Sequence, residues 1–321
     1  MTARVFVTRR LPAAGLAPLR EAGLAVDVYD GEEAVPRREL LRRAAGAAAL
    51  VTLMSERVDD ELLDAAGPSL RVVANYAVGY DNVDMAACAR RGVAVANTPD
   101  VLTDATADLA FALLLAAARR LVEGDALVRS GRWTGWQPEQ LLGVPVAGAT
   151  LGLVGMGRIG SAVARRARGF GMRVLYHNRR RDEAAEAELG AVHVPLDELL
   201  AESDAVSLHV PLTPQTRHLI GARELAMMKP TAVLVNTARG PVVDEAALAA
   251  ALQAGRPFAA GLDVFEREPE VHPDLPGLPN VVLAPHVGSA TLRARTAMAL
   301  LCARAVVDVL AGRRPPNLVE P

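Results

Sequence analysis

Short apolar runs alternate with amphipathic segments along the first hundred residues of the chain. Apolar runs of this length predict strands, and apolar residues three or four positions apart predict helices. The predicted strands are Arg4–Thr8, Ala25–Tyr29, Ala49–Leu53, Leu70–Asn75 and Val93–Asn97. The predicted helices are Ala13–Glu21, Arg37–Ala45, Asp60–Ala66 and Met85–Arg90. This alternation indicates a parallel sheet that helices cover on both faces.

A second series of the same kind occupies the rest of the chain. Asn97–Asp100 separates the two series, because Pro99 pushes the residue before it out of helical geometry. One long helix is predicted from Asp104 to Arg129, and a loop from Trp133 to Val146 follows it. The next predicted strands are Thr150–Val154, Arg173–Tyr176, Ala205–Val210, Ala232–Asn236, Phe258–Asp263 and Val281–Ala284. Thr291–Leu310 predicts a last helix, which could pack on either half.

A glycine-rich segment joins the first strand of this second series to a helix. It carries Gly155, Gly157 and Gly160 in the spacing G-x-G-x-x-G, and the helix continues through Ser161–Arg168. In a strand–turn–helix context the first glycine permits the tight turn, the second lets the backbone approach a pyrophosphate, and the third allows close helix packing. The segment therefore predicts a dinucleotide site at the helix N-terminus.

The end of the following strand distinguishes between the two nicotinamide dinucleotides. NAD-selective sites usually carry an acidic residue there, which binds the ribose 2′-hydroxyl. This chain instead has Asn178, Arg179 and Arg180, and its first carboxylate is Asp182. Arginine is the common cation throughout the chain, so the missing acid is the stronger argument. It favours NADPH, with NADH as the alternative.

Three segments that follow predicted strands carry polar residues of a kind that catalysis needs. They contain Arg239, Glu268 and His286, and the carboxyl ends of parallel strands face one crevice. Reduction of a 2-keto acid requires a cation for the carboxylate, a proton donor for the oxygen and a hydride from nicotinamide. Arg239 fits the first role and His286 the second, while Glu268 would orient the imidazole and favour its charged form.

Length, charge and cysteine content narrow the class of protein. A chain of 321 residues suits two domains, and a net charge of −2 gives no reason to expect nucleic acid or an anionic membrane as a partner. Cys88 and Cys302 are the two cysteines, which indicates a reducing compartment, and the N-terminus lacks the apolar core of a signal peptide. We therefore expect a cytoplasmic protein. No histidine spacing suggests metal ligands, so no metal is expected.

Five motifs spread over nearly the whole chain resemble the D-isomer-specific 2-hydroxyacid dehydrogenases, and in particular their glyoxylate/hydroxypyruvate reductase branch. They are the glycine fingerprint and the segments Asn75–Asn82, Asn97–Asp108, Asn236–Gly240 and Ala284–Ala290. The resemblance implies two Rossmann-like or flavodoxin-like parallel-sheet domains, with the active site in the cleft between them. Residues 1–98 and 290–321 would form a discontinuous substrate-binding domain around a dinucleotide-binding domain at 99–289. It also implies a homodimer.

The same resemblance assigns roles to single residues. It makes Arg239, Glu268 and His286 the catalytic set, with a small 2-keto acid as the substrate. The cofactor-binding residues that it implies, besides the three glycines, are Thr103, Arg158, Ile159, Pro211, Thr237, Ala238 and Asp263. On the substrate side it implies backbone N–H groups of Val78 and Gly79, with Met54 and Ser55 beside them. Trp136 would reach the pocket of the neighbouring subunit, although simple loop packing also explains a tryptophan there.

Two other functions remain open on the sequence. One is a dinucleotide-sensing protein that kept the fold and lost the chemistry, as in corepressors of this family. The other is a dehydrogenase for a different small anion, such as phosphite or formate. The presence of all three catalytic residues argues against the sensor, and the keto-acid clamp argues against formate.

Overall fold

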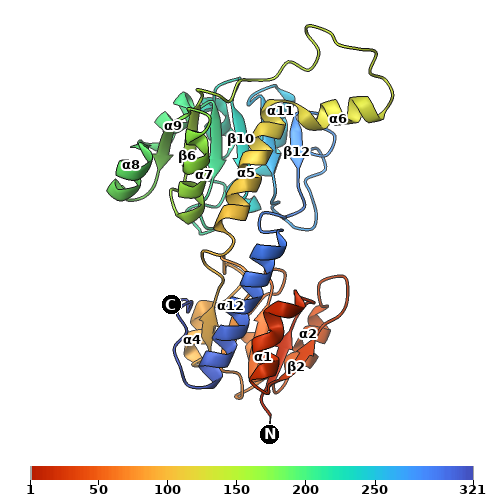
Figure 1. Ribbon diagram of the computed structural model, residues 1–321, viewed down its shortest axis with the longest axis vertical. Coiled ribbons are helices and arrows are strands. Elements are labelled where there is room, and N and C mark those ends of the chain that lie inside the picture. The colour runs from red at the N-terminus through yellow and green to blue at the C-terminus, as the bar shows by residue number, and fades with distance from the viewer. Residues whose placement is uncertain (1, 321) are drawn as a thin grey trace. The chain divides into compact units, whose positions relative to one another are not determined.

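The structure is a computed structural model that describes residues 2–320, and the chain divides into two compact units (Figure 1). Unit 1 contains the residues up to Leu102 and those from Ser289 onward, and unit 2 runs from Thr103 to Gly288. Within the described residues each unit is built on one parallel sheet, of five strands in unit 1 and seven in unit 2. The predicted α/β class with two parallel sheets is therefore confirmed. The functions predicted for the two parts stay predictions.

The sheet of unit 1 has the order β2-β1-β3-β4-β5. Its strands are β1 (Arg4–Val7), β2 (Ala25–Val28), β3 (Ala49–Thr52), β4 (Val72–Asn75) and β5 (Ala94–Ala96). Its helices are η1 (Ala13–Leu16), α1 (Ala17–Glu21), α2 (Arg37–Ala44), α3 (Asp60–Ala66), α4 (Met85–Arg90) and α12 (Leu292–Leu310). The strands β1, β3 and β4 are almost wholly buried because helices cover both faces of the sheet.

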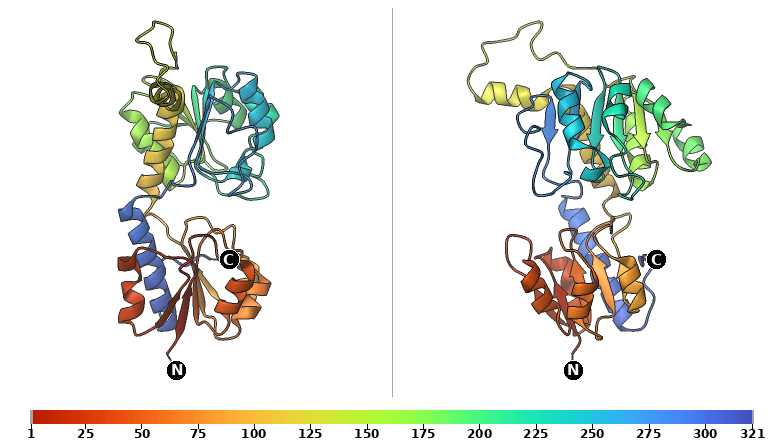
Figure 2. Two further views of the ribbon diagram at one scale, coloured as in Figure 1. Left: turned by 90° about the vertical axis from the view of Figure 1, so that its right-hand side faces the viewer. Right: turned by 180° about the vertical axis from the view of Figure 1, so that it is seen from behind.

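Two helix layers enclose this sheet (Figure 2). Leu40, Leu62 and Cys88, on α2, α3 and α4, pack with Phe6 and Leu50 of the strands in one core. Helices α1 and α12 cover the other face, and α12 also contacts β4. Tyr76, directly after β4, donates a hydrogen bond of 2.7 Å from its hydroxyl to the carbonyl of Arg295 on α12. The last helix, which the apolar pattern left open and the resemblance placed with residues 1–98, thus belongs to unit 1.

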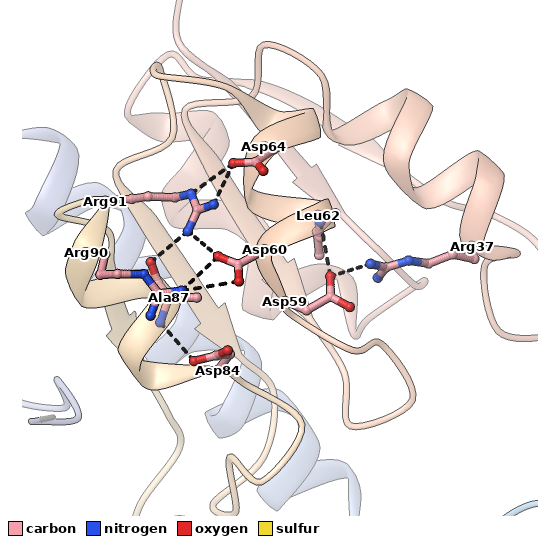
Figure 3. A network of polar contacts seen from close by, with 9 residues as sticks. All are labelled: Arg37, Asp59, Asp60, Leu62, Asp64, Asp84, Ala87, Arg90 and Arg91. Carbon is pink, nitrogen blue, oxygen red and sulfur yellow. Dashed lines mark hydrogen bonds and ion pairs between the residues drawn. The ribbon is translucent and has the colours of Figure 1, made fainter.

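An acidic and basic network ties α2, α3 and α4 together at their exposed ends (Figure 3). Asp59 caps α3 by accepting the N–H of Leu62 at 3.1 Å and is also paired with Arg37. On α3, Asp60 lies 3.0 Å from Arg90 and Asp64 lies 2.6 Å from Arg91. Single exposed ion pairs contribute little to stability, but a shared network that also caps a helix fixes the position of α3.

The sheet of unit 2 has the order β12-β11-β10-β9-β6-β7-β8. Its strands are β6 (Thr150–Val154), β7 (Arg173–His177), β8 (Val192–His193), β9 (Ala205–Leu208), β10 (Val233–Asn236), β11 (Ala259–Leu262) and β12 (Val281–Leu283). The order in which the chain adds strands reverses between β6 and β9, and ligands of such sheets bind beyond the carboxyl ends of the strands at this point.

Helices cover both faces of this sheet as well (Figure 2). They are α5 (Thr103–Ala118), α6 (Leu121–Arg129), α7 (Arg158–Arg168), α8 (Glu183–Leu189), α9 (Leu196–Glu202), α10 (Ala222–Met227), η2 (Gly240–Val242) and α11 (Glu245–Gln253). Apolar residues of α5, α7 and α8 form one core with the sheet, and those of α9, α10 and α11 form the other. In residues 2–320, no helix is long and apolar enough to span a bilayer.

The prediction of one helix from Asp104 to Arg129 was wrong. The helix ends at Ala118, and α6 begins at Leu121 after Arg120 adopts a left-handed backbone with φ of 51°. The carbonyl of Ala118 accepts the N–H of Val144 at 2.9 Å instead of continuing the helix. The helix therefore ends because its last carbonyl contacts the segment around Val144, which lies more than twenty residues later in the chain. In Figures 1 and 2, α6 and the loop after it extend away from the rest of unit 2.

Candidate active site

Three neighbouring strands of unit 2 deliver polar residues to the same edge of the sheet. Strands β10, β11 and β12 pair in parallel, so the segments that follow them leave the sheet together. Arg239 follows β10, Asp263 and Glu268 follow β11, and His286 follows β12. The carboxyl ends of these strands thus bring together residues that the sequence separates by almost fifty positions.

The imidazole of His286 is held by a carboxylate. Its Nδ1 lies 2.7 Å from Oε2 of Glu268, and both side chains are about one-third exposed or less on the protein surface. Burial alone would raise the pKa of Glu268, but the hydrogen bond and the charge of His286, with the N–H of Phe265 and the charge of Arg239, hold it below its usual value. Glu268 is therefore a carboxylate at neutral pH, and it fixes the ring with Nε2 directed away from the pair.

Asp263 fixes the backbone that carries His286. Its buried carboxylate accepts the N–H of Val287 at 2.7 Å and the N–H of Gly288 at 2.8 Å, and its carbonyl accepts the N–H of His286 at 2.9 Å. His286 has a φ of 53°, a left-handed conformation that a non-glycine residue rarely adopts. Burial raises the pKa of Asp263, although the two N–H groups oppose this effect. We interpret Asp263 as the residue that holds this strained turn; its predicted contact with the cofactor stays a prediction.

The loop that carries Arg239 is organised by the last residue of β10. Asn236 is buried, and its Nδ2 donates to the carbonyl of Arg239 at 2.9 Å while its Oδ1 accepts the N–H of Ala238 at 3.0 Å. These bonds close a tight turn over Thr237. The guanidinium of Arg239 contributes to the low pKa of Glu268, so the predicted catalytic arginine lies close enough to influence that carboxylate.

A pair of glutamates connects this loop to the one that carries Glu268. The carboxylate of Glu245, at the start of α11, accepts the N–H of Glu266 at 2.8 Å, and the carboxylate of Glu266 accepts the N–H of Glu245 at 3.0 Å. His218 adds a contact of 3.1 Å to Glu266. Burial is the largest effect on Glu245 and raises its pKa. Nothing in the sequence pattern singles out Glu245 and Glu266, since the exchange depends on two segments twenty-one residues apart.

The glycine-rich turn after β6 has the geometry that a dinucleotide needs. Gly155 has a φ of 101°, and a side chain there would meet the backbone of His209 at 2.7 Å. A side chain at Gly160 would lie 2.2 Å from the carbonyl oxygen of Gly155, whereas one at Gly157 would point into open space. Gly157 is the N-cap of α7 and supplies no side-chain cap, so the first N–H groups of this helix suit a pyrophosphate. Arg158 and Ile159 form that first turn.

The end of β7 lies next to this turn and carries the residues predicted to choose between cofactors. Asn178 uses its Oδ1 to accept the N–H of Met156 at 2.7 Å, which braces the glycine turn. Arg179 and Arg180 are exposed. Arg181 is paired with Glu186 at 2.6 Å, and Asp182 caps α8 by accepting the N–H of Ala185 at 3.0 Å. Asp182 and Glu186 are thus engaged by other groups.

The remaining predicted cofactor residues lie around the sheet edge or on α5. Thr103 is the first residue of α5, and Pro211 follows β9, where its carbonyl accepts the hydroxyl of Thr216 at 2.7 Å. His209, two residues before Pro211, lies beside Gly155. Burial lowers the pKa of His209 to about 4. This neutral imidazole contacts Ser207 at 2.9 Å.

The predicted substrate residues of unit 1 lie on two loops that follow the adjacent strands β3 and β4. Met54 and Ser55 follow β3, and Val78 and Gly79 follow β4. Asn97 donates to the carbonyl of Val78 at 2.8 Å, and Asn75 donates to that of Gly79 at 2.9 Å. The peptide units on either side of Gly79 are therefore held in a fixed orientation.

Trp136 lies in the loop between α6 and β6 and is 83% exposed. Its predicted place in the pocket of the neighbouring subunit stays a prediction. No group of three or more His, Cys, Asp or Glu side chains in the described part of the chain forms a metal site.

Comparison with known proteins identifies the family to which the chain belongs. Residues 111–288 match the model of the D-isomer specific 2-hydroxyacid dehydrogenase, NAD binding domain. The chain is 55% identical to the glyoxylate reductase of Thermococcus gammatolerans, with 100% of this chain and 96% of that protein covered. It is 53% identical to the glyoxylate reductase of Korarchaeum cryptofilum, over 100% of this chain and 96% of that protein.

Solved structures give the same result. A protein of Thermus thermophilus is 51% identical, with a TM-score of 0.93 over 99% of this chain and 100% of that one. The NADPH-dependent glyoxylate/hydroxypyruvate reductase of Sinorhizobium meliloti, in complex with NADP and malonate, is 38% identical. Its TM-score is 0.82, over 97% of this chain and 93% of that one.

Proposed function

The chain belongs to the D-isomer-specific 2-hydroxyacid dehydrogenase family, and we propose that it reduces a small 2-keto acid, such as glyoxylate or hydroxypyruvate, to the D-2-hydroxy acid. It is an oxidoreductase that uses a nicotinamide dinucleotide. The observation that carries the proposal is the pair of His286 and Glu268 at 2.7 Å, on a sheet edge that also carries Arg239.

The residues of unit 2 supply the proton and the charge that this reduction needs. Glu268 accepts from Nδ1 of His286, so Nε2 is the ring nitrogen that gives its proton to the carbonyl oxygen of the substrate. Glu268 stabilises the charged imidazolium before the transfer. Arg239 provides paired donors for the substrate's carboxylate or carbonyl oxygen. When bound, the reduced nicotinamide supplies the hydride.

The reaction is tested by following loss of reduced nicotinamide with glyoxylate. Replacing the proton donor in His286→Ala should lower kcat by about 100- to 10,000-fold and leave the Kd for NADPH nearly unchanged. His272→Ala is the matched control, because this histidine of unit 2 contacts the N–H of Asp274 and not Glu268. Wild-type kcat with weakened NADPH binding in His286→Ala would assign this residue to the cofactor. Dinucleotide binding without turnover of any small anion would favour the sensor.

We propose that NADPH is the preferred cofactor. Arg179 and Arg180 are exposed at the end of β7, while Asp182 caps α8 and Glu186 is paired with Arg181, so two cations are available to a 2′-phosphate. The NADPH dependence of the Sinorhizobium meliloti relative supports this choice. The double variant Arg179→Ala, Arg180→Ala should raise KM for NADPH at least about tenfold and leave KM for NADH unaffected. Arg181→Ala, which removes an arginine already paired with Glu186, is the control.

We also propose that the protein acts as a homodimer in the cytoplasm. Helix α6 has no buried residue, and it and the following loop expose large apolar side chains, namely Leu121, Val122, Val128, Trp133, Trp136 and Leu142. An exposed apolar segment that extends from its own unit suits a second copy of the chain. The two cysteines are unpaired and buried, which agrees with a reducing compartment. Light scattering of the wild type should give twice the chain mass, and Trp136→Ala with Leu142→Ser should shift it toward the monomer.

A further inference from the structure

A buried carboxylate lies behind the loop that follows β3 in unit 1. Glu56 is 3% exposed, and its Oε2 accepts the N–H of Leu53 at 2.6 Å and the hydroxyl of Thr8 at 2.7 Å. Its Oε1 accepts the hydroxyl of Ser55 at 2.5 Å. Three donors from the ends of β1 and β3 thus compensate a group whose burial would otherwise be costly.

This arrangement determines the direction of the Ser55 hydroxyl. A backbone N–H can only donate, so Oε2 of Glu56 is an acceptor toward Leu53, and a carboxylate has acceptors alone. The hydrogen of the Ser55 hydroxyl therefore points at Glu56. Ser55 itself is exposed, and the lone pairs of its oxygen remain on the side away from Glu56. Toward a ligand, Ser55 is an acceptor and not a donor.

Two asparagines connect Ser55 to the loop of Val78 and Gly79. Asn82 donates to the carbonyls of Leu53 at 3.0 Å and Glu56 at 2.9 Å, and it also contacts Asn75 at 3.1 Å. Asn75 in turn donates to the carbonyl of Gly79 at 2.9 Å. The loop that carries Ser55 and the loop predicted to hold the substrate carboxylate are thus fixed to one another within unit 1.

We infer that Ser55 is a specificity-determining residue that favours 2-keto acids with a hydrogen-bond donor on carbon 3, and that Glu56 is the positioning residue that gives Ser55 this polarity. The inference rests on the proposed reduction of 2-keto acids. A hydroxyl on carbon 3 can donate to the Ser55 oxygen, whereas the methyl group of pyruvate leaves that oxygen without a partner, and glyoxylate has no carbon 3. A site that binds a substrate hydroxyl discriminates because the analogue leaves a polar group unpaired.

The first test compares kcat/KM for hydroxypyruvate with kcat/KM for glyoxylate in each variant. The ratio should fall about tenfold in Ser55→Ala, the effect of one lost hydrogen bond, and it should recover in Ser55→Thr, which keeps the hydroxyl. Ser69→Ala, at an exposed serine of unit 1 that donates to the carbonyl of Ala47, is the control and should leave the ratio unchanged. An unchanged ratio in Ser55→Ala overturns the inference.

The second test reverses the polarity and leaves Ser55 in place. In Glu56→Gln the amide oxygen must still face the N–H of Leu53, so the amide NH₂ faces Ser55 and turns its hydrogen toward the substrate. Fluoropyruvate offers fluorine where hydroxypyruvate has its hydroxyl and cannot donate. The ratio of kcat/KM for hydroxypyruvate to that for fluoropyruvate should therefore fall in Glu56→Gln. An equal loss for both substrates would mean that Glu56 has only a structural role.

Failure of the inference and failure of the proposed function give different results. Wild-type protein that reduces none of the three keto acids with NADPH or NADH contradicts the proposed function. Wild-type protein that reduces them all, with ratios that Ser55→Ala does not change, contradicts the inference alone. Should Glu56→Gln fail to fold, Ser55→Ala and Ser55→Thr still decide it.

Discussion

Gly240 lies where the loop of Arg239 packs against the loop of Glu268. The substitution Gly240→Ala, which adds one methyl group, tests whether catalysis requires this close packing of the two loops. A Cβ at Gly240 would lie 1.9 Å from the carbonyl carbon of Phe265 and 2.0 Å from its oxygen, where real Cβ contacts are essentially never under 3.0 Å. The neighbours are backbone atoms, which cannot rotate away. In Gly240→Ala the two loops must therefore separate by about 1 Å.

That displacement sets the size of the expected effect. Arg239 is the residue before Gly240, and Glu268 is three residues after Phe265, so the separation moves the arginine away from the Glu268–His286 pair. A misplacement of about 1 Å in a catalytic constellation can cost about 100-fold in rate. We expect kcat/KM for glyoxylate to fall by about this factor.

The assay is steady-state reduction of glyoxylate, with cofactor binding and thermal unfolding measured on the same samples. Gly277→Ala is the matched control, since a side chain at Gly277 meets no atom within 4 Å and its backbone needs no left-handed conformation. A Gly240→Ala variant with the stability and kcat/KM of Gly277→Ala would refute the reasoning. A variant with lower stability but unchanged kcat/KM would show that the loops relax without moving Arg239.

Glu268→Gln should lower kcat/KM for glyoxylate by about 10- to 100-fold, because the amide cannot stabilise the imidazolium of His286. Glu270→Gln, at an exposed residue nearby, is the control and should leave kcat/KM for glyoxylate unchanged. Burial alone would raise the pKa of Asp59, but Arg37 and the N–H of Leu62 outweigh burial, so the pKa in the folded protein is lower than usual. The contribution of Asp59 to folding stability is therefore present above the unfolded pKa of about 4, and it is lost as pH falls through the lower folded pKa. Asp59→Asn keeps the helix cap, but below about pH 4 the free energy of unfolding, measured with urea, should depend less on pH than in the wild type. The same pH dependence in both proteins would contradict this prediction. Tyr76→Phe should lower the free energy of unfolding by about 1 kcal/mol, because it removes the hydrogen bond between the Tyr76 hydroxyl and the carbonyl of Arg295. This hydroxyl is buried, and burial raises the pKa of Tyr76 to about 12. Tyr80→Phe, at a tyrosine that is 40% exposed, is the control and should not lower the free energy of unfolding.

The alternation of apolar runs and amphipathic segments predicted both sheets because it records burial, and burial dominates the choice of strand. Strands such as Thr150–Val154 are bounded in the structure as the sequence predicted. The break at Arg120 escaped prediction because no local signal marks it: the carbonyl of Ala118 is taken by Val144, a partner that exists only once the chain has returned. Helices end for tertiary as well as local reasons.

The candidate site divides in the same way. Arg239, Glu268 and His286 could be predicted because strand ends in a parallel sheet meet at one edge, and their residue types fit one reaction. Glu245 and Glu266 could not, since each binds a backbone N–H of the other's segment and neither belongs to a motif. Asn236 belongs to a motif, but its two hydrogen bonds within the turn of Arg239 become visible only in the structure. Likewise the hydroxyl direction of Ser55 depends on Glu56, which sequence proximity alone does not reveal.

The exchange of backbone N–H groups between Glu245 and Glu266 has a thermal consequence. The first turn of a helix frays before the helix as a whole melts, and in this protein the first turn of α11 holds one half of the exchange. When that turn opens, the loop that leads to Glu268 loses its support while both sheets stay intact. On warming, the enzyme should therefore lose activity reversibly at a temperature below its unfolding temperature.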